Sequence, residues 1–143
     1  MKTLSVLLIA FILLAACKKV PSPGSALPSL VGLWELHSQT TYEYINGAAQ
    51  SPQYYEVDSS VGDYIAFDRD GTGSISVPVG AQFQITNFSY TKSGQNLTLY
   101  ESEIIKHDTL LKLTHNSLII RDVVLTSDSS GNKKTVTDTD YER

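Results

Sequence analysis

The segment DRDGTGSISVPV, residues 68–79, is the closest approach to a metal-binding pattern in this chain. Its first, third and fifth residues carry side-chain oxygens and its sixth is Gly73, as in a calcium-binding loop. The twelfth position, where such a loop needs a bidentate glutamate, is Val79, and Pro78 prevents an exit helix. Aspartate and glycine are also the residues that accept the backbone angles of a tight hairpin. We therefore predict a turn here and no metal site.

The three histidines do not converge on a recognisable metal site. His37 and Glu35 lie two residues apart on one face of an expected strand, which allows only a weak surface site. His107 precedes Asp108 in an expected loop, and His115 lies in an expected hairpin turn. We expect all three imidazoles to be solvated polar groups.

Motifs of the common catalytic classes are missing from the sequence. There is no Gly-x-Ser-x-Gly elbow, His-Glu-x-x-His motif or glycine-rich phosphate loop. The carboxylates of Asp138 and Asp140 share one strand face near the C-terminus, where solvation explains them. We predict that the protein is not an enzyme, has no catalytic residues and uses no cofactor.

The charge balance and the cysteine count exclude further classes of protein. The 143 residues contain 15 Asp and Glu against 11 Lys and Arg, a formal net charge of −4. A nucleic-acid binder needs clustered Lys and Arg to neutralise phosphates, so we expect no nucleic-acid partner. The single cysteine, Cys17, rules out an internal disulfide framework and a cysteine-rich zinc site.

Residues 1–16 have the pattern of a secretory signal. Lys2 provides a positive start, and the apolar stretch 4–14 is shorter than the about 20 residues that span a bilayer. The sequence LAAC at 14–17 resembles the lipobox of bacterial lipoproteins. That resemblance implies cleavage before Cys17, a diacylglycerol on its thiol and acylation of the new amine. An ordinary signal with the same cleavage point and a free Cys17 thiol is the alternative.

Residues 17–29 are expected to form a lipidated tether. The run VPSPGSALPS at 20–29 holds prolines, serines and a glycine, a composition that does not pack into a core. Lys18 and Lys19 suit the anionic headgroups of a membrane surface, and two or more acyl chains anchor a protein stably. The globular domain is therefore predicted to cover 30–143.

The globular domain has the period of two that is typical of half-buried strands. In GLWELHSQTTYEY, residues 32–44, Trp34, Leu36, Tyr42 and Tyr44 share one parity, while the charged residues fall on the other. Further alternating segments are separated by short turns, and no window after Cys17 has a convincing helical apolar face. The expected hairpins pair these segments: 63–68 with 74–79, 82–92 with 97–105, 108–114 with 118–125, and 121–127 with 133–141.

Successive hairpins without helices favour an all-β, up-and-down antiparallel meander. Closing the meander into an eight-stranded barrel removes its exposed edges, and such a barrel is just wide enough for side chains or one small ligand. An open sandwich of two sheets is the competing arrangement. Phe83 and Ile85 are odd-numbered whereas Phe88 and Tyr90 are even, so both pairs can face inward only if a bulge lies near 86–87.

Two short motifs resemble the lipocalin-like lipoproteins of Bacteroidetes-type bacteria. Gly32-Leu33-Trp34 is similar to the Gly-x-Trp signature of lipocalin barrels, and residues 64–73 are similar to the aromatic strand and Asp-Gly-x-Gly hairpin of the lipoproteins. The resemblance implies a closed lipocalin-like barrel whose tryptophan plugs one end. It also implies that a late basic residue packs across the tryptophan, and Arg121 and Arg143 both remain candidates. Plain core packing without ligand contact is the alternative role of Trp34.

The expected barrel interior defines a candidate ligand site. Its inward residues are predicted to be Trp34, Leu36, Tyr42, Phe67, Phe88, Tyr90 and Leu99. The longest connection, 45–62, contains Tyr54 and Tyr55, and in lipocalins the corresponding loop lids the open end. We therefore expect these two tyrosines to cover the barrel mouth, the alternative being simple packing onto its rim.

These inferences predict a lipid-anchored envelope lipoprotein without catalytic activity. Its barrel would hold a small apolar or amphipathic molecule. Alternatively, a filled barrel would serve as an interaction module for an envelope protein partner. Surface-exported lipoproteins of this bacterial group tend to carry acidic residues after the cysteine. Lys18 and Lys19 stand there instead, so we expect a periplasm-facing anchor in the outer membrane.

Overall fold

The computed structural model describes residues 27–56, 62–129 and 131–143. The predicted signal 1–16, the lipid-attachment residue Cys17 and most of the tether lie outside the described residues. Within them the chain forms β strands and no helix, so no helix there is long and apolar enough to cross a bilayer. The strands are β1 (Gly32–Ile45), β2 (Ala48–Ala49), β3 (Gln53–Glu56), β4 (Tyr64–Phe67), β5 (Thr72–Val79), β6 (Gln82–Ser93), β7 (Asn96–Glu101), β8 (Ile104–Leu113), β9 (Ser117–Asp128) and β10 (Gly131–Glu142).

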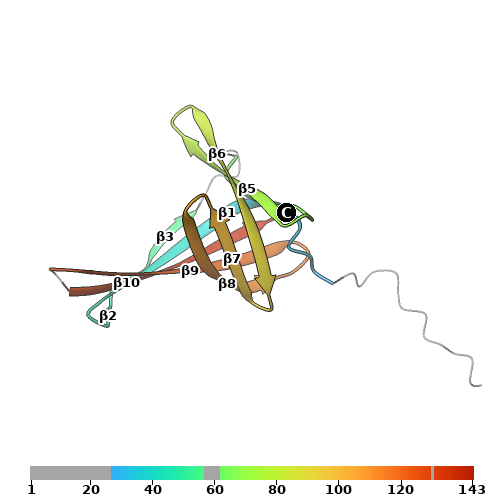
Figure 1. The fold of residues 1–143 in the computed structure, drawn as a ribbon. Helices are drawn as coiled ribbons and strands as arrows, with labels where there is room; N and C mark the ends of the chain where they lie inside the picture. Colours follow the sequence, from blue (N-terminus) through green and yellow to red (C-terminus); the bar gives the residue numbers. More distant parts are fainter. Residues whose placement is uncertain (1–26, 57–61, 130) are drawn as a thin grey trace, which may run out of the picture.

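The strands form one antiparallel meander that closes on itself (Figure 1). From β4 to β10 each strand pairs with the next, β4 pairs with β1, and β10 returns to pair with β1. The predicted all-β, eight-stranded closed barrel is therefore confirmed, in place of the open sandwich. The connection expected at 45–62 is more ordered than predicted, because β2 and β3 within it add to the same edge of β1 as β4.

Trp34 plugs the end of the barrel where the described chain begins. Its ring is fully buried, at 0% exposure, and its Nε1–H donates to the Leu30 carbonyl at 2.7 Å. The guanidinium carbon of Arg143 lies 3.7 Å from the centroid of the ring, and its Nη2 donates to the Val31 carbonyl at 2.6 Å. The late basic residue across the tryptophan is therefore Arg143. Arg121 instead pairs with Asp138 at 2.6 Å.

Gly32 makes the stacking of Arg143 on Trp34 sterically possible. Its φ is +134°, a conformation that glycine adopts without strain. A Cβ built at this position would meet Arg143 Nη2 at 2.7 Å. The Gly-x-Trp motif therefore has a packing reason, since only the bare backbone leaves room for the guanidinium.

Aromatic rings continue the core behind this plug. Phe67 packs edge-to-face on both Phe88 and Tyr90, with ring centroids 5.6 and 5.0 Å away. The Tyr90 hydroxyl donates to the Asp68 carbonyl at 2.7 Å, which satisfies the polar end of a partly buried ring. Aliphatic side chains from other strands complete the buried cluster: Leu30, Ile65, Leu97, Leu99, Leu110, Leu118 and Ile120.

A bulge at His37 reverses which residues of β1 face inward. Leu36 pairs with Tyr141 and Ser38 with Asp140, so His37 has no partner on β10. Side chains alternate along a strand, and one extra residue therefore exchanges the two faces beyond this point. The uniform parity predicted for residues 32–44 is wrong for the second half of the strand.

The consequence is clearest at Tyr42. Its neighbour Thr41 pairs with Thr137, whose side chain lines the barrel interior, so Tyr42 lies on the outer face. The predicted inward position of Tyr42 is thus wrong. The bulge expected near 86–87 is absent as well, because β5 and β6 pair without a register shift, and Phe83 and Ile85 are exposed.

The turn between β4 and β5 has the hydrogen bonds of a hairpin. The backbone N–H and the hydroxyl of Thr72 both donate to Asp70 Oδ1, at 3.0 and 2.6 Å. These bonds hold the pKa of the Asp70 carboxyl below its ordinary value. Gly71 has a φ of +86°, as the tight turn requires. The calcium-like pattern is therefore explained by turn geometry.

We predict that Arg143→Ala lowers the free energy of unfolding by about 2 kcal/mol. The substitution removes a cation–π contact with Trp34 and hydrogen bonds to the carbonyls of Val31 and Ser29. Urea unfolding followed by tryptophan fluorescence measures the change. Arg69→Ala, in the exposed turn, is the control and should stay within about 0.5 kcal/mol of wild type. Equal effects of the two substitutions would contradict the role assigned to Arg143.

Candidate functional site

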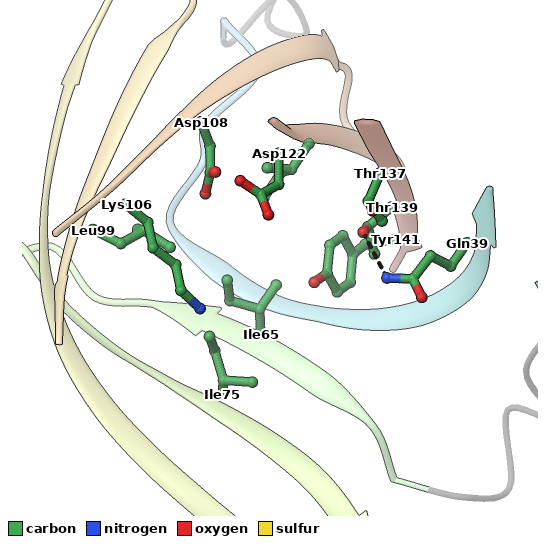
Figure 2. Close-up of a pocket in the computed structure, with 11 residues that line it drawn as sticks. Gln39, Ile65, Ile75, Leu99, Lys106, Asp108, Asp122, Thr137, Thr139 and Tyr141 are labelled. Carbon is green, nitrogen blue, oxygen red and sulfur yellow. Dashed lines mark hydrogen bonds between the residues drawn. The ribbon is translucent and has the colours of Figure 1, made fainter. Parts of the chain in front are cut away.

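A cavity of about 240 Å³ occupies the barrel interior on the side of the core away from Trp34 (Figure 2). Side chains from every barrel strand except β6 line it. Its apolar wall is formed by Ile65, Ile75, Leu99 and Ile120, and its polar wall by Gln39, Lys106, Asp108, Asp122, Thr137, Thr139 and Tyr141. The cavity is therefore amphipathic rather than uniformly apolar.

The predicted ligand residues divide between the cavity, the core and the outer face. Only Leu99 of that set lines the cavity. Leu36 is half-buried opposite Tyr141, and Tyr42 lies outside the barrel. The aromatic members that point inward pack in the core instead, which fits the plain packing role considered for Trp34: Trp34, Phe67, Phe88 and Tyr90.

The expected lid residues lie on a strand rather than in a loop. Tyr54 and Tyr55 belong to β3 and pair with Thr40 and Gln39 of β1. Their side chains are 63% and 64% exposed, and neither lines the cavity. The two tyrosines therefore extend the barrel wall beside β4.

The polar wall is the part of the site that sequence reasoning missed. We expected a loop at His107 before a strand at 108–114, but β8 begins at Ile104 and carries His107 and Asp108 within the strand. Lys106 and Asp108 then share the inward parity with Leu110, and Asp122 shares it with Ile120 on β9. Continuing that alternation from the buried leucine would have placed these charges inside.

Asp108 is the most unusual group in the cavity. The residue is only 7% exposed, and its carboxylate oxygen Oδ1 has no hydrogen-bond partner. Burial, together with the negative charge of Asp122, raises the pKa of this carboxyl to about 6. Lys106 and His107 oppose the shift. Among the described residues no cation lies within ion-pair distance of it, because Lys106 Nζ is 3.9 Å from Glu101 instead.

Tyr141 and Gln39 add neutral polar groups next to this carboxyl. Burial raises the pKa of the Tyr141 phenol, and the negative charges of Asp63 and Asp108 raise it further, so the hydroxyl stays protonated. The amide of Gln39 donates to the Thr139 hydroxyl at 3.4 Å, as the dashed line in Figure 2 marks. The cavity thus offers hydroxyl and amide groups beside the buried carboxylates.

The part of the chain that the structure describes holds no group of three or more potential metal ligands. A larger hollow of about 600 Å³ lies at the end of the β9–β10 hairpin, beside Tyr44. Of its two lysines, Lys133 pairs with Glu43 at 2.8 Å, and the Nζ of Lys134 lies over the Tyr44 ring. Its charged groups already have partners, which leaves the interior cavity as the candidate site.

Fold and cavity together define a small closed β-barrel with a partly open interior site. A protein-family profile described as "Lipocalin-like domain" matches residues 30–120. The chain therefore belongs to the lipocalin-like family. Among solved structures it is similar to a deswapped triple mutant of bovine odorant binding protein, at 16% identity and a TM-score of 0.41 over 78% of this chain and 72% of that chain. A search of curated proteins finds no match.

We predict that Asp108→Asn stabilises the protein at neutral pH. Because the folded-state pKa of about 6 lies above the ordinary aspartate value of 3.8, the folded state holds this proton more tightly than the unfolded state does. The stability that the protonated group contributes is present below about pH 4 and lost as pH rises through about 6. The gap between variant and wild type should therefore widen by about 2 kcal/mol from pH 4 to 7.

Urea unfolding across this pH range measures the gap. Asp70→Asn is the matched control with the opposite sign, because hydrogen bonds to Thr72 lower the pKa of Asp70. A gap for Asp108→Asn that does not change with pH would show that this carboxyl is hydrated in the folded protein.

Proposed function

We propose that this chain is a lipid-anchored bacterial envelope lipoprotein whose barrel binds a small molecule without transforming it. The observation that carries the binding function is the interior cavity with an unpartnered carboxyl oxygen of Asp108. A buried polar group without a partner is costly, and such groups concentrate at functional sites. Membership of the lipocalin-like family supports the same function, since barrels of this size hold one small ligand.

The shape of the interior supports a ligand smaller than a typical drug. Drug-sized ligands occupy pockets of roughly 300–1,000 Å³, and an apolar cavity of about 150 Å³ holds benzene. A volume of about 240 Å³ lies between these limits. At the ~25 Å³ per atom that the benzene cavity implies, it accepts about nine or ten non-hydrogen atoms.

The anchoring part of the proposal is supported by the sequence at residues 14–17. LAAC follows a positive start and a short apolar stretch, the order found in lipoprotein signals. The described chain enters the barrel beside the Trp34 plug, whereas the turns after β5, β7 and β9 lie at the opposite end. A lipid on Cys17 would therefore hold the plugged end nearest the membrane and leave the other end facing the periplasm.

A second function is favoured by the β5–β6 hairpin. Figure 1 shows its tip standing away from the barrel. Phe83 and Ile85 on this hairpin are 57% and 58% exposed, and Val77 and Val79 are exposed on its opposite face. Exposed apolar clusters of this kind mark protein contacts. The hairpin therefore supports an interaction module that docks on an envelope protein.

We predict that native mass spectrometry of the protein isolated from its own host shows a retained small molecule. Ile75→Trp should abolish retention, because residue 75 lines the cavity and a larger ring fills it. Val123→Trp on β9 is the control, since Val123 is 43% exposed and lies on the strand face opposite to that of the cavity-lining Asp122. A protein partner in place of a small molecule would favour the interaction module. An empty protein in both cases would contradict ligand binding.

We predict that the mature protein begins at Cys17 and carries acyl chains on that residue. Intact mass and fatty-acid labelling in the host measure the modification, and Cys17→Ser should abolish both labelling and cleavage. Protease treatment of intact cells should leave the protein uncut if the anchor faces the periplasm. A mature chain with an unmodified thiol would contradict the anchor and leave the binding function untouched.

A further inference from the structure

The cavity lacks a hydrogen-bond donor at one defined point. Asp108 is 7% exposed, its Oδ1 accepts no hydrogen bond, and Figure 2 shows its carboxylate directed into the same space as that of Asp122. Buried carboxylates in folded proteins normally accept several hydrogen bonds or pair with a cation. A ligand that donates a hydrogen bond to Asp108 Oδ1 would therefore satisfy this oxygen.

The charges around this point favour a cation as that ligand. One lysine and two aspartates line the cavity, a net charge of −1, and Asp63 adds a negative charge close to Tyr141. Lys106 offsets this charge only in part: it opposes the rise in the pKa of Asp108, but its side chain is 46% exposed and its Nζ lies 3.9 Å from a Glu101 carboxylate oxygen. His107, on the opposite face of β8, lies 3.3 Å from the Thr98 hydroxyl.

We propose that the cavity binds a small organic ammonium ion, with the ammonium on Asp108 and a short apolar body against Ile65, Ile75 and Leu99. This inference rests on the proposed binding function and names the ligand class. An ammonium has three donors, and Asp108, Asp122 and Tyr141 all present oxygens on the polar wall, with the two carboxylates directed toward the same space (Figure 2). The apolar wall then covers the rest of the ligand.

The same geometry makes the binding depend on pH. The pKa of Asp108 is about 6, so the carboxyl is mostly ionised at pH 7.5 and about one-tenth ionised at pH 5. An ammonium keeps its proton across this range. Affinity should therefore fall about tenfold from pH 7.5 to pH 5. The charged or titratable groups around Asp108 are Asp122 on β9, Lys106 and His107 on β8, and Tyr141 on β10.

Three probes of nearly equal size separate charge from shape. They are 3-phenylpropylamine, 3-phenylpropan-1-ol and 3-phenylpropionate, measured by titration calorimetry at pH 7.5 with the full soluble domain, residues 17–143, carrying Cys17→Ser. We expect the amine to bind about 10- to 100-fold more tightly than the alcohol, the range of a charge-assisted hydrogen bond. The carboxylate should bind least.

Variants then assign the preference to Asp108. Asp108→Asn should weaken amine binding about 10- to 100-fold, remove its pH dependence and leave alcohol binding within about threefold. Lys106→Met should strengthen amine binding by removing a competing positive charge. His107→Gln should keep the pH dependence, and Glu35→Gln, an exposed change of the same formal charge, should change nothing. Urea unfolding of each variant checks that it is folded.

The outcomes separate this inference from the broader function. Equal binding of amine and alcohol, a preference for the carboxylate, or an unchanged Asp108→Asn would overturn the ammonium site, while loss of alcohol binding in Ile75→Trp would still support a ligand cavity. If no probe binds, the molecule retained from the host decides: a cationic molecule supports the inference and an uncharged or anionic one overturns it. No probe and no retained molecule would contradict both proposals.

Discussion

The pairing of β10 with β1 is the interaction on which the rest of this structure depends. It runs from Glu35 opposite Glu142 to Ile45 opposite Lys133 and turns an open meander into a closed barrel. Without it the sheet would have two free edges, and water would reach both walls of the interior. Closure is therefore what withdraws Asp108 from solvent and gives the cavity its chemistry.

Because of the bulge at His37, β1 contributes side chains both to the apolar core and to the polar cavity. Before the bulge, β1 directs Trp34 into an apolar core that Arg143 covers from outside. After it, β1 directs Gln39 into the polar cavity beside Thr139. Burial of the aromatic side chains at one end stabilises the folded state. Burial of the Asp108 carboxyl without a hydrogen-bond partner at the other end offsets part of that stabilisation. The division assigns stability to one end of the barrel and binding to the other.

The sequence was sufficient for the architecture because local signals determine it. Alternation between turn residues predicts the order of strands, and short hairpins leave a closed meander as the simplest arrangement that removes the sheet edges. The Gly-x-Trp motif predicted the plug, and the turn at 68–73 was predicted from Asp and Gly alone. These features involve residues that are close together in the chain.

The site depended on pairings that the sequence alone does not specify. The bulge at His37 arises from the register with β10, about a hundred residues later, and it reversed the face predicted for Tyr42. Phe67, Phe88 and Tyr90 are inward as their parity suggests, but they fill the core instead of lining a cavity. Asp108 was missed because it was predicted as the first residue of a strand, directly after an expected loop at His107, whereas β8 already begins at Ile104 and carries Asp108 in its middle.

The central claim is that barrel closure buries an ionisable carboxyl which a ligand's positive charge then stabilises. A carbon-13 NMR titration of the Asp108 side chain in the folded protein tests it most directly. We expect the Asp108 carboxyl to have a pKa of about 6 in the empty protein and a lower pKa when 3-phenylpropylamine is bound. A value near 3.8 in the empty protein, unchanged by the amine, would mean that water reaches this group and would contradict the account.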